Sequence, residues 1–92
     1  MVLSTRSSTA DDYIVSLDVG SSSIRTLLFD ASARQMEGYG ARAGYRLETT
    51  PGGGVEIDPE KLAELAIDCL EELHRQVKAA GLRIAAVAAC AF

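Results

Sequence analysis

The 92-residue chain is predicted to be an α/β domain with a mixed sheet, in the order strand, strand, strand, helix, strand. Three observations predict this fold class: two extended apolar segments flank a short polar turn, a long amphipathic helix follows a glycine-rich loop, and an uncharged apolar segment follows the helix. The order implies an antiparallel meander and then a right-handed crossover, with the last strand parallel to an earlier one. A chain of this size forms one small core, which excludes a complete two-lobed enzyme.

The first two strands are expected to form a hairpin. Residues 1–12 are rich in Ser, Thr and Asp and show no periodicity, so we expect a flexible leader there and a domain over residues 13–92. Residues 13–19 and 24–30 are β-branched and apolar with extended patterning, and the Gly-Ser-Ser-Ser sequence between them consists of turn-forming residues.

The middle of the chain has a weaker pattern. Three glycines dilute the alternation in residues 33–48, which we expect to form a third, irregular strand. Residues 49–54 contain a proline and three consecutive glycines, which predicts a loop.

The helix is the clearest element. Asp58 is a suitable N-cap, Pro59 suits the first helical position, and Gly81 can supply the left-handed residue that ends the helix. One apolar stripe is predicted to face the core; it consists of Leu62, Leu65, Ala66, Cys69, Leu70, Leu73 and Val77. On the opposite face, Glu71 and Arg75 are spaced for an ion pair of about 0.3–0.5 kcal/mol.

Residues 84–92 are apolar and uncharged, which predicts a parallel strand covered on both faces, with helical continuation through the alanines as the alternative. An apolar strand at the end of a chain is a template for pairing, so we expect self-association through it and interpret the chain as the front piece of a longer protein. Cys69 and Cys90 fit no metal-ligand spacing, and we expect both to be reduced thiols in the core.

The charge balance excludes some function classes. The chain has 9 Lys and Arg against 13 Asp and Glu, a net charge of −4, and no basic cluster, which argues against nucleic acid as a partner. No segment has the pattern of a secretory signal or the length of a membrane span, so we expect no membrane association and a cytoplasmic location.

The candidate site is residues 18–25, Asp-Val-Gly-Ser-Ser-Ser-Ile-Arg. A carboxylate at a strand end can hold hydrated magnesium, and glycine lets a ligand approach the backbone. Three hydroxyl groups and the turn amides can surround phosphate oxygens, and Arg25 adds a fixed positive charge. The segment is therefore a candidate nucleotide phosphate site.

This segment resembles the first phosphate loop of the FGGY carbohydrate kinases, in the sugar kinase, Hsp70 and actin superfamily. Residues 53–59, Gly-Gly-Val-Glu-Ile-Asp-Pro, are similar to the family's Gly-Trp-Val-Glu-Gln-Asp-Pro segment before its first helix, and residues 84–91 are similar to the strand that leads into its sugar-binding loop. Gly54 stands where the family usually has Trp, and Phe92 falls about where many xylulose-type members have Gln.

The resemblance implies part of a ribonuclease-H-like, or actin-like ATPase, lobe that uses ATP and Mg²⁺ to phosphorylate a sugar or polyol hydroxyl. By position, Asp18 would act near the metal, Gly20, Ser21, Ser22 and Ser23 would meet ATP phosphates, and Arg25 would stabilise the transferred charge. The family's catalytic base and adenosine-binding segment lie downstream of Phe92, so we expect no turnover from these residues alone.

Other interpretations stay open. The turn can be an ordinary hairpin in a stand-alone interaction domain, since Asp, Gly and Ser are common turn residues. An actin-like or Hsp70-like ATPase module, whose nucleotide state controls partner binding, is the other alternative. His74 has no second ligand at metal-binding spacing and is expected to be a solvated or packing residue.

Overall fold

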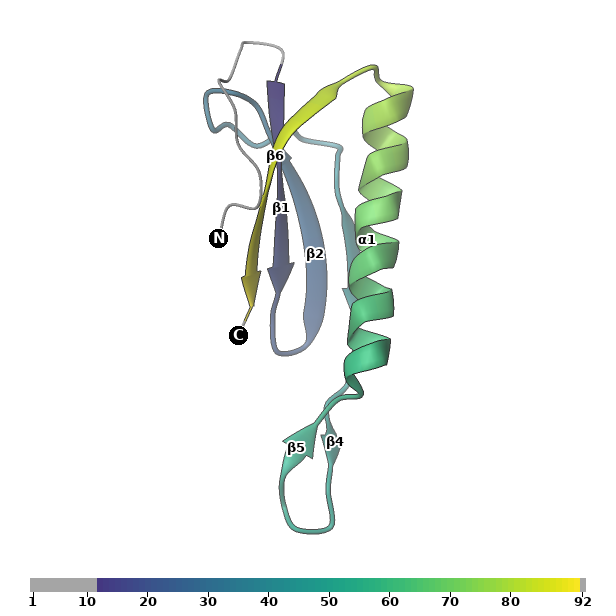
Figure 1. The fold of residues 1–92 in the computed structure, drawn as a ribbon. Coiled ribbons are helices and arrows are strands. Elements are labelled where there is room, and N and C mark those ends of the chain that lie inside the picture. Colours follow the sequence, from purple (N-terminus) through teal and green to yellow (C-terminus); the bar gives the residue numbers. More distant parts are fainter. Residues whose placement is uncertain (1–11, 92) are drawn as a thin grey trace.

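The computed structural model describes residues 12–91 and contains one four-stranded sheet, one helix and a small separate hairpin (Figure 1). The sheet has the strand order β3-β2-β1-β6. In chain order the elements are β1 (Asp12–Val19), β2 (Ser23–Phe29), β3 (Ala41–Gly44), β4 (Glu48–Thr49), β5 (Val55–Glu56), α1 (Pro59–Ala79) and β6 (Arg83–Ala91).

The predicted topology is confirmed. Strands β1, β2 and β3 form an antiparallel meander, and β6 returns from the helix to pair in parallel with β1. Residues 84–91 are extended, so the helical alternative for the alanines is wrong. The expected leader lies outside the described residues except for Asp12, which already belongs to β1. Its side chain is 1% exposed, and the Nε of Arg83 donates to its Oδ1 at 2.7 Å.

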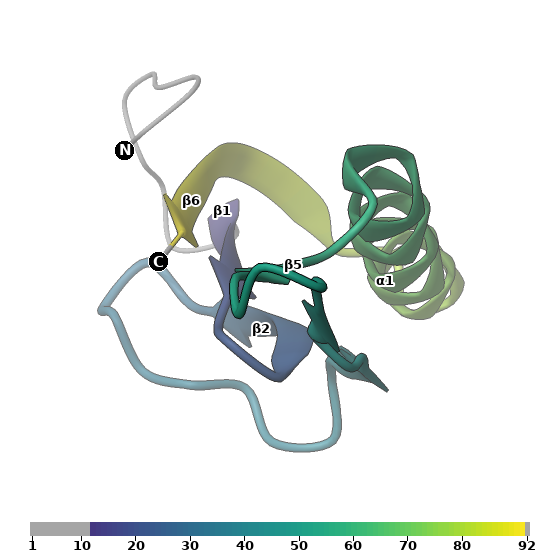
Figure 2. The same cartoon turned by 90° about the horizontal axis from the view of Figure 1, so that it is seen from below.

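Helix α1 lies along one face of the sheet, mainly over β2 and β3, as Figures 1 and 2 show from two directions. The core between helix and sheet is formed by Val15, Leu28, Leu73 and Val77. Because side chains alternate along a strand, the strand residues that neighbour these core residues point to the opposite face of the sheet. No described helix covers that face.

The helix begins and ends as its sequence predicts. The Oδ1 of Asp58 accepts a hydrogen bond from the amide of Glu60 at 3.0 Å, and Pro59 is the first helical residue. Gly81 follows the C-cap with φ of 71°, the left-handed conformation that glycine adopts without strain. The predicted ion pair of Arg75 is wrong, because its guanidinium contacts Glu72, three residues away, instead of Glu71.

The third strand is shorter than predicted. Ala41–Gly44 is the stretch that pairs with β2 as a strand, and Gln35 adds one isolated bridge to Phe29. Met36 and Tyr39 lie in the preceding loop and pack against the core. Gly40 has φ of 139°, and a Cβ there would lie 2.6 Å from the carbonyl oxygen of Thr26. The side chain of Gln76 hydrogen-bonds both the amide and the carbonyl of Gly40, at 2.8 and 2.9 Å. Glycine is required where the loop enters β3.

The glycine-rich segment is more ordered than a plain loop. The short strands β4 and β5 pair around it, and the amide of Thr50 donates to the carbonyl of Gly54 at 2.8 Å. This small hairpin projects beyond the main sheet, at the lower end of Figure 1. It was not predicted because each strand has only two residues, too few to show alternation.

Two expectations for the last strand are wrong. Strand β6 is not covered on both faces: Ala85 is its one buried residue among those described, because α1 lies over β2 and β3. Cys90 is exposed near the end of this strand, whereas Cys69 belongs to α1 and is buried against the sheet as expected.

Candidate functional site

The candidate phosphate turn joins β1 to β2 at one end of the sheet. Strands β1 and β6 run in parallel and end side by side, with Val19 opposite Ala91, and the first turn of α1 lies toward the same end (Figure 1). Figure 2 shows this end toward the viewer. Ligands of open α/β sheets bind outside the carboxyl ends of parallel strands, so the turn lies where this architecture favours a ligand.

The turn keeps part of its hydrogen-bonding capacity. The amide of Gly20 donates to the carbonyl of Ser23 at 2.9 Å and closes the hairpin. Ser21 and Ser22 are exposed at the tip, and neither amide donates a hydrogen bond to another described residue. Two N–H groups and their serine hydroxyls are therefore available to an anion such as a phosphate.

Asp18 and Arg25 face each other across the hairpin. They are register partners of β1 and β2, and the Nε of Arg25 donates to Oδ2 of Asp18 at 3.4 Å. The neighbouring residue Thr26 contacts the helix, so the alternation puts Asp18 and Arg25 on the sheet face opposite α1. Their side chains are 41% and 56% exposed, so solvent and ligands can reach both charges.

Of the predicted site residues, the structure brings together Asp18, Arg25 and the turn residues 20–23. Ser23 is the first residue of β2 and lies on the same sheet face as Arg25, two positions away. Carboxylate, guanidinium and the free turn amides thus occupy one end of one hairpin.

Sequence reasoning missed Arg42. It is the register partner of Arg25 on β3, so the two arginines are direct cross-strand neighbours on the open sheet face. Arg42 is exposed and forms no ion pair with any described carboxylate. Like charges placed opposite each other are unfavourable unless an anion lies between them, so the pair favours an anionic ligand. Only the pairing register of β2 and β3 could have revealed it.

Tyr45 was also missed as a site residue. Its hydroxyl group donates to the carbonyl of Gly20, and its amide donates to the carbonyl of Ser22 at 3.0 Å. The sequence showed an aromatic residue in an irregular strand and gave no signal of this contact.

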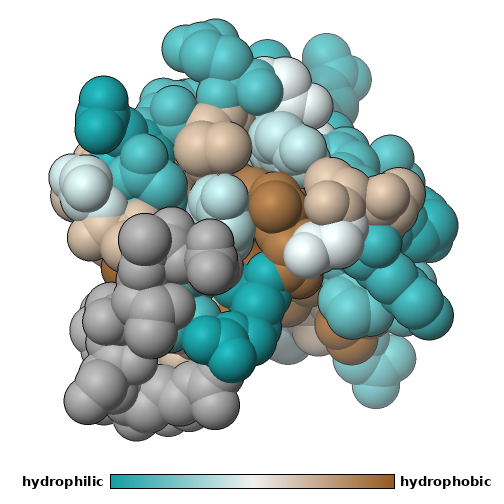
Figure 3. Space-filling model, turned by 90° about the horizontal axis from the view of Figure 1, so that it is seen from above, coloured by the Kyte–Doolittle hydropathy of each residue, from teal (hydrophilic) through white to brown (hydrophobic). Residues whose placement is uncertain are grey.

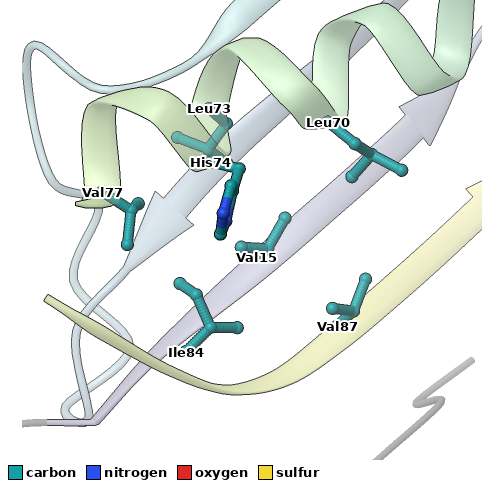
Figure 4. Close-up of a pocket in the computed structure, with 7 residues that line it drawn as sticks. All are labelled: Val15, Leu70, Leu73, His74, Val77, Ile84 and Val87. Carbon is teal, nitrogen blue, oxygen red and sulfur yellow. The ribbon is translucent and has the colours of Figure 1, made fainter. Parts of the chain in front are cut away.

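A groove and a hollow between α1 and β6 differ chemically from the turn. An apolar groove of about 260 Å³ runs between α1 and β6, where His74 lies among aliphatic side chains (Figure 4); the others are Val15, Leu70, Leu73, Val77, Ile84 and Val87. An open hollow at the far end of the helix is lined by Val77, Leu82 and Ile84 together with His74, Lys78 and Arg83. Figure 3 shows apolar surface exposed among polar residues at that end. With one ionisable side chain, the groove lacks the groups that phosphate chemistry needs.

Metal ligands are sparse. Within residues 12–91, no three His, Cys, Asp or Glu side chains gather where they could hold a metal ion. A magnesium ion at the turn would therefore have Asp18 as its one carboxylate. Magnesium is often bound in this way, since it keeps several waters and takes substrate phosphates as its other ligands.

Comparison with known proteins identifies relatives of the chain. No family model matches it. It is 30% identical over 78 residues to autoinducer-2 kinase of Salmonella typhimurium and 32% identical over 78 residues to that of Escherichia coli, which covers 85% of this chain. The chain spans 15% of the length of these relatives.

A solved structure shows the same fold. The gluconate kinase of Lactobacillus acidophilus superposes on 87% of this chain and 15% of its own, with a TM-score of 0.73 and 24% sequence identity. The mixed sheet and helix thus have the fold of part of that kinase, the actin-like ATPase fold, as predicted. Within residues 12–91, no helix has the apolar length that a membrane crossing requires.

The matching region, the fold and the acid-to-arginine turn agree, and the chain accordingly resembles part of an FGGY-type carbohydrate kinase in sequence and fold.

Proposed function

We propose that this chain supplies the phosphate-binding hairpin of an ATP-dependent kinase that phosphorylates a sugar or polyol hydroxyl. The observation that supports the proposal most is the exposed turn at residues 21–22, whose two amides have no acceptor among the described residues, next to the facing charges of Asp18 and Arg25. This is the donor set that a nucleotide's phosphates require.

Each group has a distinct part in the proposal. The amides and hydroxyls of Ser21, Ser22 and Ser23, with the bare backbone of Gly20, bind the phosphate oxygens of ATP. Arg25, already held near the turn by Asp18 at 3.4 Å, stabilises charge on the transferred phosphoryl group. Phosphoryl transfer needs positioning and electrostatic stabilisation more than covalent chemistry, so a rigid hairpin is a suitable platform.

Asp18 is the residue that would hold Mg²⁺. Its carboxylate is 41% exposed, and its one described ion-pair partner, Arg25, is at the long distance of 3.4 Å, which leaves oxygen lone pairs for a hydrated cation. When bound, magnesium would neutralise phosphate charge, while the protein's part is to fix the position of the carboxylate.

We expect the other functional groups of the kinase outside this segment. We expect the catalytic base and the adenosine-binding residues downstream of Phe92, in a longer polypeptide that acts in the cytoplasm. In this proposal the 92-residue chain alone does not catalyse turnover and binds ATP weakly. The apolar strand β6 lies at one edge of the main sheet, and self-association through it stays a prediction.

A kinase assay tests the activity. The longer polypeptide that contains this segment is incubated with Mg·ATP and a panel of sugars and polyols, as wild type and as Asp18→Ala. We expect phosphorylation of at least one sugar and a loss of at least about 100-fold in the variant, as for other groups that stabilise transition-state charge. Full activity in Asp18→Ala would contradict the role of Asp18. ATP hydrolysis with no sugar phosphorylated would favour the actin-like or Hsp70-like alternative instead.

A further inference from the structure

Tyr45 contacts the phosphate turn from a distant part of the sequence. It follows directly after β3, which ends at Gly44. Its side-chain hydroxyl donates to the carbonyl of Gly20, and its backbone amide donates to the carbonyl of Ser22 at 3.0 Å. One residue therefore binds two alternate carbonyl groups of a turn that lies 25 positions earlier in the chain.

We infer that Tyr45 is a positioning residue that orients the turn amides toward a bound phosphate; this inference rests on the proposed function of the turn. Tyr45 acts through the turn backbone and not through direct contact with the ligand.

The planarity of the peptide bond supports this role. The carbonyl of Gly20 and the amide of Ser21 belong to one rigid peptide unit, and no described peptide bond is cis, so this N–H points away from the carbonyl. By binding the carbonyl, the Tyr45 hydroxyl fixes the direction of the Ser21 amide. The Tyr45 amide fixes the Ser23 amide in the same way, through the carbonyl of Ser22.

The contact also removes an unfavourable feature of the turn. Carbonyl oxygens carry partial negative charge and would repel phosphate if they faced the ligand. Both carbonyls that Tyr45 binds are turned toward it, while the exposed amides of Ser21 and Ser22 have no acceptor among residues 12–91. A turn held in this way is preorganised, so less ordering free energy is lost when an anion binds.

Tyr45→Phe separates the two contacts. The substitution removes the hydroxyl bond to Gly20 and leaves the backbone bond to Ser22 in place. We therefore expect a change at the Ser21 amide and none at the Ser23 amide. Tyr39→Phe is the matched control, because Tyr39 is a partly buried aromatic residue packed against the core, and its hydroxyl contacts no turn residue.

The experiment uses the ¹⁵N-labelled 92-residue chain as wild type, Tyr45→Phe and Tyr39→Phe. Residual dipolar couplings report the direction of each amide, and titration with inorganic pyrophosphate reports binding. In Tyr45→Phe we expect an altered Ser21 coupling, an unchanged Ser23 coupling and about 3- to 10-fold weaker pyrophosphate binding, the loss that one hydrogen bond predicts. Tyr39→Phe should match the wild type in all three.

The outcomes separate the inference from the proposed function. An unchanged Ser21 coupling in Tyr45→Phe, or an equal change at Ser21 and Ser23, would overturn the positioning role. Wild-type turn amides that do not respond to pyrophosphate would overturn the proposed function, while the couplings would still decide whether Tyr45 orients Ser21. Equal loss of binding in Tyr39→Phe would show a general packing effect and would also overturn the inference.

Discussion

Arg25 and Asp18 are direct cross-strand partners, and the Nε of the arginine lies 3.4 Å from Oδ2 of the aspartate. The pair is exposed, so its own contribution to stability is small. Its importance is in placing opposite charges beside a turn with free amides. In the proposed function, Arg25 binds phosphate and Asp18 binds the metal ion.

Asp18→Asn separates these two effects. Without magnesium, we expect the variant to bind pyrophosphate about 2- to 5-fold more tightly than the wild type, because a negative charge near the anion is removed. With magnesium, the variant should lose the metal-dependent increase in affinity that the wild type shows. Isothermal titration with and without MgCl₂ measures both. Equal magnesium dependence in the two proteins would contradict the metal role of Asp18.

Arg42→Gln tests the second arginine. Because Arg42 lies opposite Arg25, its removal should weaken pyrophosphate binding by about 10-fold or more, the effect of one charge-assisted hydrogen bond. Arg34→Gln is the matched control, since Arg34 is exposed at the other end of β2 beside Asp30. The same loss of affinity in both variants would point to net charge alone.

Gly40→Ala should destabilise the fold. The alanine Cβ would meet the carbonyl oxygen of Thr26 at 2.6 Å, and the φ of 139° disfavours any side chain. We expect a loss of about 2–4 kcal/mol in the free energy of unfolding. Gly52→Ala is the control, because its Cβ would meet no atom within 4 Å. Urea unfolding measures both, and equal stability of the two variants would contradict the close approach.

Thiol labelling tests the burial of the two cysteines. Burial raises the pKa of the Cys69 thiol, and the carboxylate of Asp68 adds to the shift. Cys69 is 3% exposed and Cys90 is exposed, so Cys90 should react with a disulfide reagent at least about 10-fold faster. Equal rates at both cysteines in the folded chain would contradict the packing of α1.

The raised pKa of Cys69 also makes the stability of the fold depend on pH. A raised thiol pKa means that the folded chain holds the proton more tightly than the unfolded chain does. The contribution of Cys69 is therefore fully present below the pKa of the unfolded thiol and is lost as the pH rises through the pKa of the folded one. Urea unfolding across this alkaline range should show the decline.

The order of strands and helix along the chain was predictable because the signals for each element are local. Asp58, Pro59 and Gly81 mark the helix ends by capping chemistry that depends only on near neighbours. The exposure of Cys90 was not predictable, because it depends on where α1 lies over the sheet.

For the candidate site, the sequence indicated the residues of one hairpin, since Asp18, the turn and Arg25 are contiguous. Arg42 and Tyr45 reach the same hairpin only through the register of β2 and β3. Pairing between segments that are separated in the chain leaves no mark in a local pattern.

The most direct test of the central claim is an NMR titration of the labelled 92-residue chain with Mg·ATP, because it follows every amide at once. The account predicts that the largest shifts fall on residues 18–25, even where binding is weak, and that Arg25→Ala reduces them. Unchanged resonances in residues 18–25 at saturating nucleotide, or shifts confined to the apolar groove around His74, would contradict it.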